Sequence, residues 1–269
     1  MSGLEKALLR DVAAAWPIKN SPLIQCITNE ITCESMANAL LYVDANPVMA
    51  DDIREVDEFF AQNDGLLLNL GHITDGKAQA LQAAARYGKA TETPIVVDLV
   101  GVAATQLRYD LAWQLWESEP QVIKGNLSEM RRFCGLASRA RGVDGSIEDQ
   151  EVAALRELAA AMQKVCQRRP LVLLATGPVD LVVTEKRRLQ LTNGVAQLDR
   201  FTGTGDIVGS LIAALLGAGN APLVATVAAV SYFNLCGEAA AQVTVAKGLG
   251  LAAFRQETLD RLSLLMSDE

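Results

Sequence analysis

The sequence predicts an α/β fold in which helices wrap a mostly parallel sheet. Short runs of Val, Ile and Leu, such as IVVD at 95–98, alternate along the chain with longer helical patterns. These runs lack the apolar–polar alternation of a half-exposed sheet, so both faces of the strands should be buried. Beyond about residue 180, short alternating segments with charged and Asn-Gly turns replace this pattern. They indicate antiparallel hairpins at one edge of the sheet.

The first hundred residues are expected to form alternating helices and strands. Met36, Leu40 and Leu41 recur at helical spacing, and Asp51 and Asp52 supply the acidic first turn of the next helix. The expected helices lie at 1–16, 29–45, 51–63 and 73–90, and the expected strands at 22–28, 46–50, 65–71 and 93–101.

The remainder continues this pattern and ends in Ala-rich helices. The polar stretch RARGVDGSIED at 139–149 is the best loop candidate, and EKRR at 185–188 fits an exposed hairpin tip. Further helices are expected at 109–117, 128–133, 150–167, 207–216, 222–236 and 258–266, and further strands at 121–126 and 170–177. No internal repeat or linker interrupts the chain, so we expect one domain over residues 1–269.

Composition narrows the classes of function. The 269 residues carry a net charge of −8, which disfavours binding to nucleic acid. The longest apolar stretch, 207–218, is too short to cross a membrane, and the charged N-terminus does not resemble a signal peptide. Five scattered cysteines fit reduced thiols in a cytoplasmic protein. The single histidine, His72, excludes a multi-histidine zinc site, and we expect it to have a structural or surface role.

Polar residues and glycines follow the predicted parallel strands. In open parallel sheets, ligands bind beyond the carboxyl ends of the strands. Loops are polar in general, but six such loops at one edge favour a binding site. The residues in question are Asn29, Met49, Asp51, Asn69, Gly71, Asp98, Gly101, Lys124, Asn126, Glu129, Thr176 and Gly177.

The segment TGTGD at 202–206 precedes the apolar helix 207–216 and is the most specific indication of a functional site in the sequence. Gly203 and Gly205 permit a tight turn, and the first turn of a helix offers unpaired N–H groups to an anion. Asp206 has two interpretations: an N-cap of the helix, or a general base that accepts a proton from an attacking hydroxyl during phosphoryl transfer.

Asp98 and Glu129 are the best candidates for a Mg²⁺ site, because each lies just past a predicted strand. Alternatively, Asp98 caps a loop and Glu129 is an ordinary acid in the first turn of a helix. Lys124 either meets a phosphate or is a solvated lysine. The chain lacks a Walker A motif, and the glycines around residue 205 miss the dinucleotide-binding spacing.

The order of these motifs resembles the hydroxyethylthiazole kinases of the ribokinase-like superfamily over about residues 20–240. The matching segments are CITN, ANALL, NPVMAD, LNLG, VVDLVG, VIKGNLSE, ATG and TGTGD. The resemblance implies a three-layer α/β/α fold, thiamin salvage, and transfer of a phosphoryl group from ATP to the alcohol of 5-(2-hydroxyethyl)-4-methylthiazole. It also implies a Mg²⁺ requirement and a homotrimer with the thiazole site at the subunit interface.

The same resemblance assigns roles to residues of this chain. It places Asn29, Met49 and Gly203 at the thiazole, and Lys124, Thr176 and Asn126 at the nucleotide. It gives Asp98 and Glu129 to Mg²⁺, Gly203 and Gly205 to the anion hole, and the role of base to Asp206.

Four departures from the family pattern keep other functions open. Leu99 stands where DPVG has proline, Lys124 replaces an arginine, Asp206 replaces the cysteine of TGTGC, and the C-terminal Gly-rich segment is only loosely echoed at 248–254. Asp at position 206 is the residue of the wider superfamily and supports catalysis. The alternatives are a kinase for another vitamin precursor, of hydroxymethylpyrimidine or pyridoxal type, and a ligand-binding relative without activity.

Overall fold

The computed structural model describes residues 3–60, 62–136 and 147–264. Within them, eight strands form one sheet in the order β2-β1-β3-β4-β5-β6-β7-β8. The strands are β1 (Leu23–Ile27), β2 (Asn46–Val48), β3 (Gly65–Asn69), β4 (Ile95–Asp98), β5 (Val122–Asn126), β6 (Val172–Thr176), β7 (Asp180–Val183) and β8 (Arg188–Leu191). Pairing is parallel up to β6 and antiparallel for β7 and β8. The predicted mostly parallel sheet with an antiparallel edge is confirmed.

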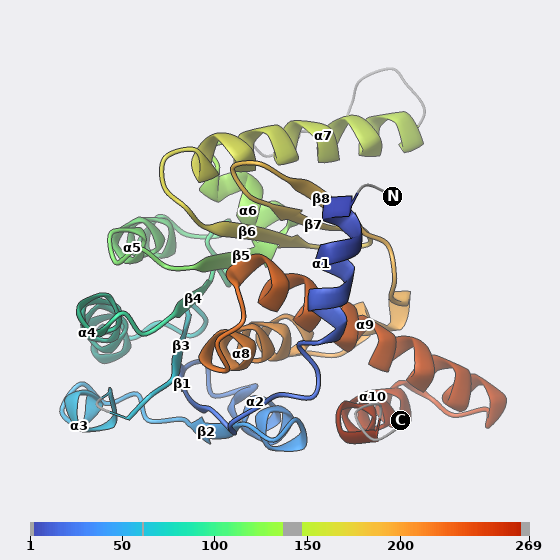
Figure 1. Cartoon of the computed structure of the whole chain (residues 1–269), viewed down its shortest axis with the longest axis horizontal. Helices are drawn as coiled ribbons and strands as arrows, with labels where there is room; N and C mark the ends of the chain where they lie inside the picture. Colours follow the sequence, from blue (N-terminus) through green and yellow to red (C-terminus); the bar gives the residue numbers. More distant parts are fainter. Residues whose placement is uncertain (1–2, 61, 137–146, 265–269) are drawn as a thin grey trace.

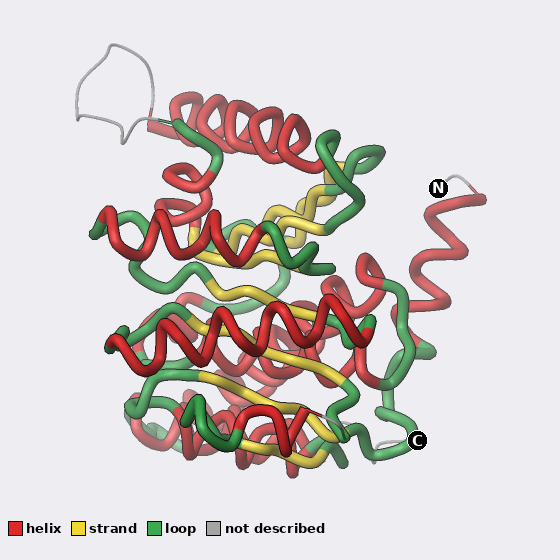
Figure 2. The backbone as a smooth tube through the Cα atoms, turned by 90° about the vertical axis from the view of Figure 1, so that its left-hand side faces the viewer, coloured by secondary structure: helices red, strands yellow, loops and turns green. Residues whose placement is uncertain are grey.

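Helices cover both faces of this sheet and complete three layers (Figure 1). The helices are α1 (Gly3–Ala13), α2 (Cys33–Tyr42), α3 (Val56–Phe60), α4 (Asp75–Thr91), α5 (Gln106–Trp116), α6 (Leu127–Phe133), α7 (Ile147–Cys166), α8 (Thr204–Gly217), α9 (Pro222–Ala246) and α10 (Leu251–Leu264), with a 3₁₀ turn η1 (Ala196–Arg200). Figure 2 looks onto the layer that contains α3, α4, α5 and α7, which lie one above another in front of the strands.

Successive strand residues enter two separate cores. On β3, Leu67 packs with the buried residues of α2, α8 and α9, whereas Leu66 and Leu68 pack with those of α4, α5 and α7. Val96 and its neighbour Val97 on β4 divide in the same way. Both faces of the parallel strands are therefore buried, which explains why these segments are uninterrupted runs of aliphatic residues.

The structure corrects several predicted boundaries. The helix expected at 51–63 is only α3, because Asp52 accepts hydrogen bonds from the backbone and guanidinium of Arg54 and forms a local turn instead. α8 begins at Thr204, α9 continues ten residues beyond the expected end at 236, and α10 begins at Leu251. Most of the predicted loop at 139–149 lies outside the described residues, and its end already belongs to α7.

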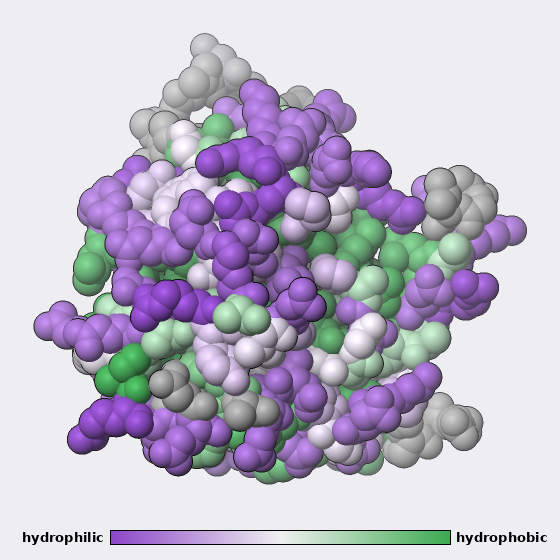
Figure 3. Space-filling model, turned by 60° about the vertical axis from the view of Figure 1, so that its left-hand side comes forward, coloured by the Kyte–Doolittle hydropathy of each residue, from purple (hydrophilic) through white to green (hydrophobic). Residues whose placement is uncertain are grey.

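One helix of the described chain, α9, is long and apolar enough to cross a membrane by length and composition. Its apolar window is 61% buried within the chain, against α8, α10 and β6. This burial is typical of a core helix in a globular protein. Hydrophilic side chains cover most of the face shown in Figure 3, with smaller apolar groups between them.

Candidate active site

The sheet register brings three polar residues side by side at the carboxyl ends of neighbouring strands. Asn69 at the end of β3 pairs with Asp98 at the end of β4, and Asp98 pairs with Lys124 on β5. All three side chains are buried, with at most 2% of each residue exposed. The predicted gathering of strand ends is therefore present, and it places an amide, a carboxylate and an ammonium group in one row.

The N-terminus of α8 faces this row. Gly203 is its N-cap residue with a φ of +101°, and a Cβ there would lie 2.8 Å from Cγ2 of Thr32. A Cβ on Gly205 would lie 3.3 Å from Nζ of Lys124. Both glycines therefore keep the first turn of α8 close to its neighbours with its N–H groups uncovered, as an anion-binding turn requires.

Asp206 lies in the first turn of α8, and three side chains hold its carboxylate. Oδ2 accepts hydrogen bonds from Thr32 Oγ1 at 2.5 Å and from Asn29 Nδ2 at 3.0 Å, and Oδ1 accepts one from Asn69 Nδ2 at 2.9 Å. Only 8% of Asp206 is exposed. Its side chain makes no capping bond in this helix, whose N-cap is Gly203, so the interpretation of Asp206 as an N-cap is wrong.

Backbone amides fix the orientation of both asparagines around Asp206. The N–H of Thr32 donates to Oδ1 of Asn29, and the N–H of Gly71 donates to Oδ1 of Asn69. Each carbonyl oxygen is thereby occupied, and each NH₂ group is turned toward Asp206. The carboxylate is therefore held by donors that cannot rotate away without breaking backbone contacts.

Asp98 and Lys124 form a buried ion pair, with 2.7 Å between Oδ2 and Nζ. This burial excludes the alternative of a solvated lysine. Burial is the main cause that raises the pKa of Asp98 to about 6; Lys124 opposes it, and the nearby charges of Asp206 and Glu129 reinforce it. Oδ1 of Asp98 is buried and has no hydrogen-bond partner within the described chain.

Glu129 lies in the first turn of α6, where it forms a capping box with Asn126. Its Oε1 accepts from the N–H of Gly101 and its Oε2 from the N–H of Asn126, both at 2.8 Å. Among the residues that the structure describes, no three His, Cys, Asp or Glu side chains cluster as a ready metal site. The acceptor that best fits a hydrated Mg²⁺ is the unpartnered Oδ1 of Asp98, because hard cations prefer oxygen ligands and Mg²⁺ keeps most of its water.

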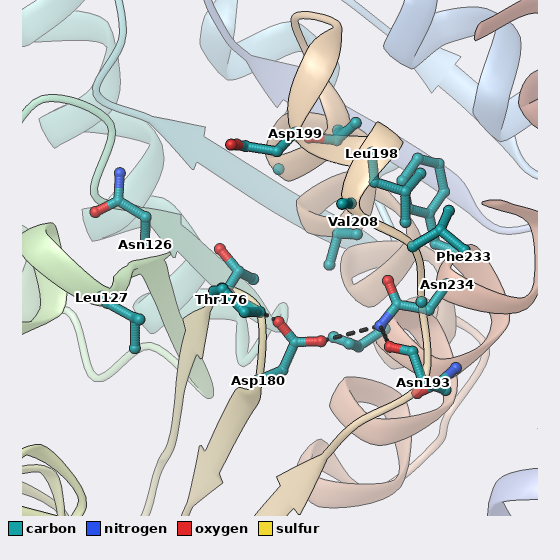
Figure 4. A pocket seen from close by; sticks show the side chains of 18 of the residues that line it. Asn126, Leu127, Thr176, Asp180, Asn193, Leu198, Asp199, Val208, Phe233 and Asn234 are labelled. Atoms are coloured by element: carbon teal, nitrogen blue, oxygen red, sulfur yellow. Dashed lines mark hydrogen bonds between the residues drawn. The ribbon is translucent and has the colours of Figure 1, made fainter. Parts of the chain in front are cut away.

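A cavity of about 600 Å³ opens between the end of β6 and the start of α8 (Figure 4). Asn126 and Thr176 line one side, Thr204 and Gly205 belong to its wall, and Phe233 lies on the opposite side. The cavity combines the first turn of α8 with apolar surface, and its size suits a nucleotide. Two of the residues expected at the nucleotide thus line it, while Lys124 lies behind Gly205.

Other expectations fall in or beside this region. Met49 is half-buried just after β2, the strand beside β1, and packs against the core on the α8 side of the sheet. His72 is exposed in a loop with a φ of +53°, which agrees with the expected position at the surface. EKRR at 185–188 forms the turn between β7 and β8 as predicted, with Arg188 as the first residue of β8.

Sequence reasoning missed several polar residues of the site. Thr32 stands three residues after Asn29, a spacing typical of a side-chain-to-backbone turn, and this was its only signal. Asp180, Asn193 and Asn234 form a buried network on the cavity wall. They come from β7, the loop after β8 and the middle of α9, so no local motif joins them.

The thiols take no part in this site. The structure contains five free cysteines, and burial raises the pKa of Cys166 and Cys236 to about 12. Such groups remain protonated at neutral pH and are poor nucleophiles.

The fold and the site define a three-layer α/β/α protein with a buried carboxylate in the first turn of a helix, beside a cavity large enough for a nucleotide. A Bacillus subtilis pyridoxal kinase in complex with ADP shares this fold, with a TM-score of 0.56 at 15% identity over 80% of this chain and 91% of that one.

Closer relatives specify the family. The chain is 63% identical to a hydroxyethylthiazole kinase of Lacticaseibacillus paracasei over 93% of this chain and 89% of that protein, and 55% identical to one of Enterococcus faecalis over 94% and 92%. The structure of a Pyrococcus horikoshii hydroxyethylthiazole kinase matches with a TM-score of 0.81 at 28% identity, over 96% and 93% of the two chains. Residues 18–268 match the model of the hydroxyethylthiazole kinase family. The chain belongs to this family and is a kinase.

Proposed function

We propose that this enzyme transfers the γ-phosphoryl group of ATP to the primary alcohol of 5-(2-hydroxyethyl)-4-methylthiazole, with Asp206 as general base. The observation that carries the proposal is the buried carboxylate of Asp206, held by Thr32, Asn29 and Asn69 in the first turn of α8. The identity to the kinases of L. paracasei and E. faecalis supports the choice of substrate.

The hydrogen bonds of Asp206 leave one acceptor position for the substrate. A carboxylate offers about four lone-pair sites, and Oδ2 uses two of its own while Oδ1 uses one. The remaining site on Oδ1 accepts the hydroxyl proton while the alcohol oxygen forms its bond to phosphorus. The bond from phosphorus to the β-phosphate oxygen breaks, and ADP leaves with that electron pair.

The first turn of α8 stabilises the charge on the transferred group. Its N–H groups around Gly203 and Gly205 lie at the positive end of the helix dipole. Lys124 is held behind Gly205 by Asp98 and adds a fixed positive charge. Asn126 and Thr176, on the cavity wall, are the residues we assign to the nucleotide.

Mg²⁺ belongs to this proposal, with Asp98 as the residue that fits it. Its unpartnered Oδ1 suits a water molecule of the hydrated ion, which when bound neutralises charge on the phosphate oxygens. Glu129 contributes by fixing the backbone at Gly101 and Asn126, and the second lone pairs of its oxygens remain for the ion's water shell.

We further propose a cytoplasmic homotrimer in which a partner subunit completes the thiazole pocket beside Asn29 and Met49. Ile31 supports this, because it is 78% exposed although it lies between Asn29 and Thr32, which hold Asp206. Val245 is 72% exposed near α10, which is tied to α2 by a hydrogen bond from Arg255 to Ser35. An exposed apolar side chain such as Ile31, next to residues of the site, fits a surface that another subunit covers.

The decisive experiment measures ADP release from ATP and Mg²⁺ with hydroxyethylthiazole as the acceptor, against a sample without acceptor. We expect release that depends on the thiazole. Hydroxymethylpyrimidine and pyridoxal are the matched alternative acceptors, and a clear preference for either would replace the proposed substrate. Binding of thiazole and ATP without turnover would show a ligand-binding relative that has lost catalysis.

Oligomerisation has its own test. Ile31→Lys places a charge in the proposed interface and should shift the protein from trimer to monomer in sedimentation, whereas Leu107→Lys, at an exposed position on α5, should leave the trimer intact. A monomeric wild-type enzyme with full activity would remove the shared pocket from the proposal.

A further inference from the structure

The cavity beside α8 has two chemically different ends. One end holds the first turn of α8, with Thr204 and Gly205, and faces Asn126 and Thr176 across the opening. The lining of the cavity also includes the apolar side chains of Leu198, Val230 and Phe233, of which Leu198 and Phe233 lie together across the cavity from Asn126 (Figure 4). Phosphates favour helix N-termini and flat aromatic bases favour apolar walls. A nucleotide in this cavity therefore has its base against Phe233.

Asn234 lies next to Phe233 at this apolar end and can present only one of its two polar atoms. Its Nδ2 donates to Oδ2 of Asp180 at 2.9 Å and to the carbonyl oxygen of Asn193 at 3.0 Å (Figure 4). Both amide hydrogens are used, so the side chain cannot flip without facing two acceptors with its own oxygen. Oδ1 is thereby turned away from Asp180, toward the cavity that Asn234 lines.

Several polar groups next to Asn234 already have protein partners. Oδ1 of Asp180 accepts from the N–H of Gly177, and Nδ2 of Asn193 donates to the carbonyl oxygen of Ser231. The N–H of Gly194 donates to Glu238. Oδ1 of Asn234 accepts no hydrogen bond from any residue that the structure describes, although the residue is only 9% exposed. It is an acceptor that this wall offers to a ligand, in addition to the exposed carboxylate of Asp199 near Leu198.

We infer that Asn234, locked by Asp180 and Asn193, is a specificity-determining residue that reads the 6-amino group of adenine. The amino group donates to Oδ1, whereas the 6-oxo group of hypoxanthine or guanine places an acceptor against it. When two acceptors face each other in a largely buried site, both lack a hydrogen bond, and this weakens the binding of the 6-oxopurine nucleotide. This inference rests on the proposed function for the identity of the cavity, and it assigns the preference for ATP over 6-oxopurine nucleotides to one oxygen atom.

The test compares nucleotides that differ at this position alone. The dissociation constants of ADP and IDP are measured by titration calorimetry without acceptor, beside the thiazole-dependent kcat/KM values for ATP and ITP. We expect the wild-type enzyme to favour the adenine nucleotide by about tenfold or more in both measurements. Equal constants for ADP and IDP in an active kinase would overturn the inference and leave the proposed function standing. An ADP preference without any phosphorylation of thiazole would support the inference about Asn234 and contradict the proposed function.

Two variants separate the role of Asn234 from a general loss of structure. Asn234→Leu should bring the ratio of ADP to IDP affinity close to one. Asp180→Asn retains the acceptor for Gly177 but turns an NH₂ group toward Nδ2 of Asn234, so it removes one of the two acceptors that hold the Asn234 amide, while the carbonyl oxygen of Asn193 remains. We expect this variant to shift preference toward IDP. A variant ratio that equals the wild-type ratio in either case would contradict the inference, and since each ratio is internal to one protein, a lower folded fraction does not change it.

Discussion

Two buried carboxylates at the same edge of the sheet are held in opposite ways. Asp206 receives three hydrogen bonds from the neutral side chains of Asn29, Thr32 and Asn69. Asp98 is bound on one oxygen by the cation Lys124, and its other oxygen has no partner in the described chain.

In the proposed mechanism, this difference separates the group that takes the proton from a group that holds charge in place. Neutral donors fix the position of Asp206 and place no opposing charge in contact with its carboxylate. A neighbouring cation instead ties the charge of Asp98 to Lys124, beside Gly205. Burial alone therefore does not distinguish these two carboxylates. The charge of their hydrogen-bond partners does.

Loss of the carboxylate at position 206 has the largest expected effect. Asp206→Asn removes the proton acceptor and turns an amide toward three donors, so kcat should fall by about 10²–10⁴ with little change in nucleotide affinity. Asp75→Asn is the matched control, because Asp75 is an exposed carboxylate in the first turn of α4. A rate for Asp206→Asn close to that of the control would remove the role of base.

The ion pair should respond to single and double changes differently. Lys124→Met leaves the Asp98 charge buried without a partner, and the free energy of unfolding should fall by about 3–5 kcal/mol. The double variant Asp98→Asn, Lys124→Met removes both charges and should recover most of that loss. Urea denaturation of the wild type, both single variants and the double variant gives the numbers, and an additive loss in the double variant would show that the two groups do not act as a pair.

Thr32 tests the support of Asp206 with a smaller expected effect. Thr32→Val retains the shape but removes the 2.5 Å hydrogen bond to Oδ2, so kcat should fall by about tenfold while the KM for ATP stays near its wild-type value. Thr32→Ser restores the hydroxyl and should restore most of the rate. Equal losses for valine and serine would point to packing around Gly203 instead of positioning of the carboxylate.

The last prediction concerns pH. The folded-state pKa of Asp98 is raised to about 6 from its ordinary 3.8, mainly by burial. The folded state therefore holds this proton more tightly, and the stability contributed by Asp98 falls as pH rises from about 4 to about 6. Unfolding free energies of the wild type minus those of Asp98→Asn should decrease across that window and level off above it. A difference that increases with pH would mean that Lys124 outweighs burial.

Much of this arrangement follows from local sequence. Aliphatic runs such as IVVD predicted the parallel strands, and the charged turn before Arg188 joins the antiparallel strands β7 and β8. The Asn-Gly pair at 193–194, expected as a hairpin turn, instead follows β8, the last strand of the described sheet. Gly203 and Gly205 before an apolar helix predicted the tight turn at the start of α8, because the spacing of glycines and a helix start are both local features.

The partners of Asp206 and the nature of Lys124 could not be predicted in that way. Asn69 and Thr32 reach Asp206 across 137 and 174 positions of sequence, so only the packed sheet joins them. Lys124 looks solvated or phosphate-bound by composition, and it is buried because the register of β4 and β5 sets it opposite Asp98. Asn234 could not be recognised from the sequence either. It lies on α9, and its partners come from β7 and from the loop after β8, far away in the chain.

The central claim, that Asp206 takes the proton of the attacking alcohol, is tested most directly with a more acidic alcohol. An analogue of hydroxyethylthiazole with two fluorines on the carbon next to the CH₂OH group loses its proton more easily and needs a base less. We predict that Asp206→Asn slows phosphorylation of this analogue much less than it slows phosphorylation of hydroxyethylthiazole itself. An equal loss for the two alcohols would contradict proton transfer to Asp206 and leave it a structural carboxylate.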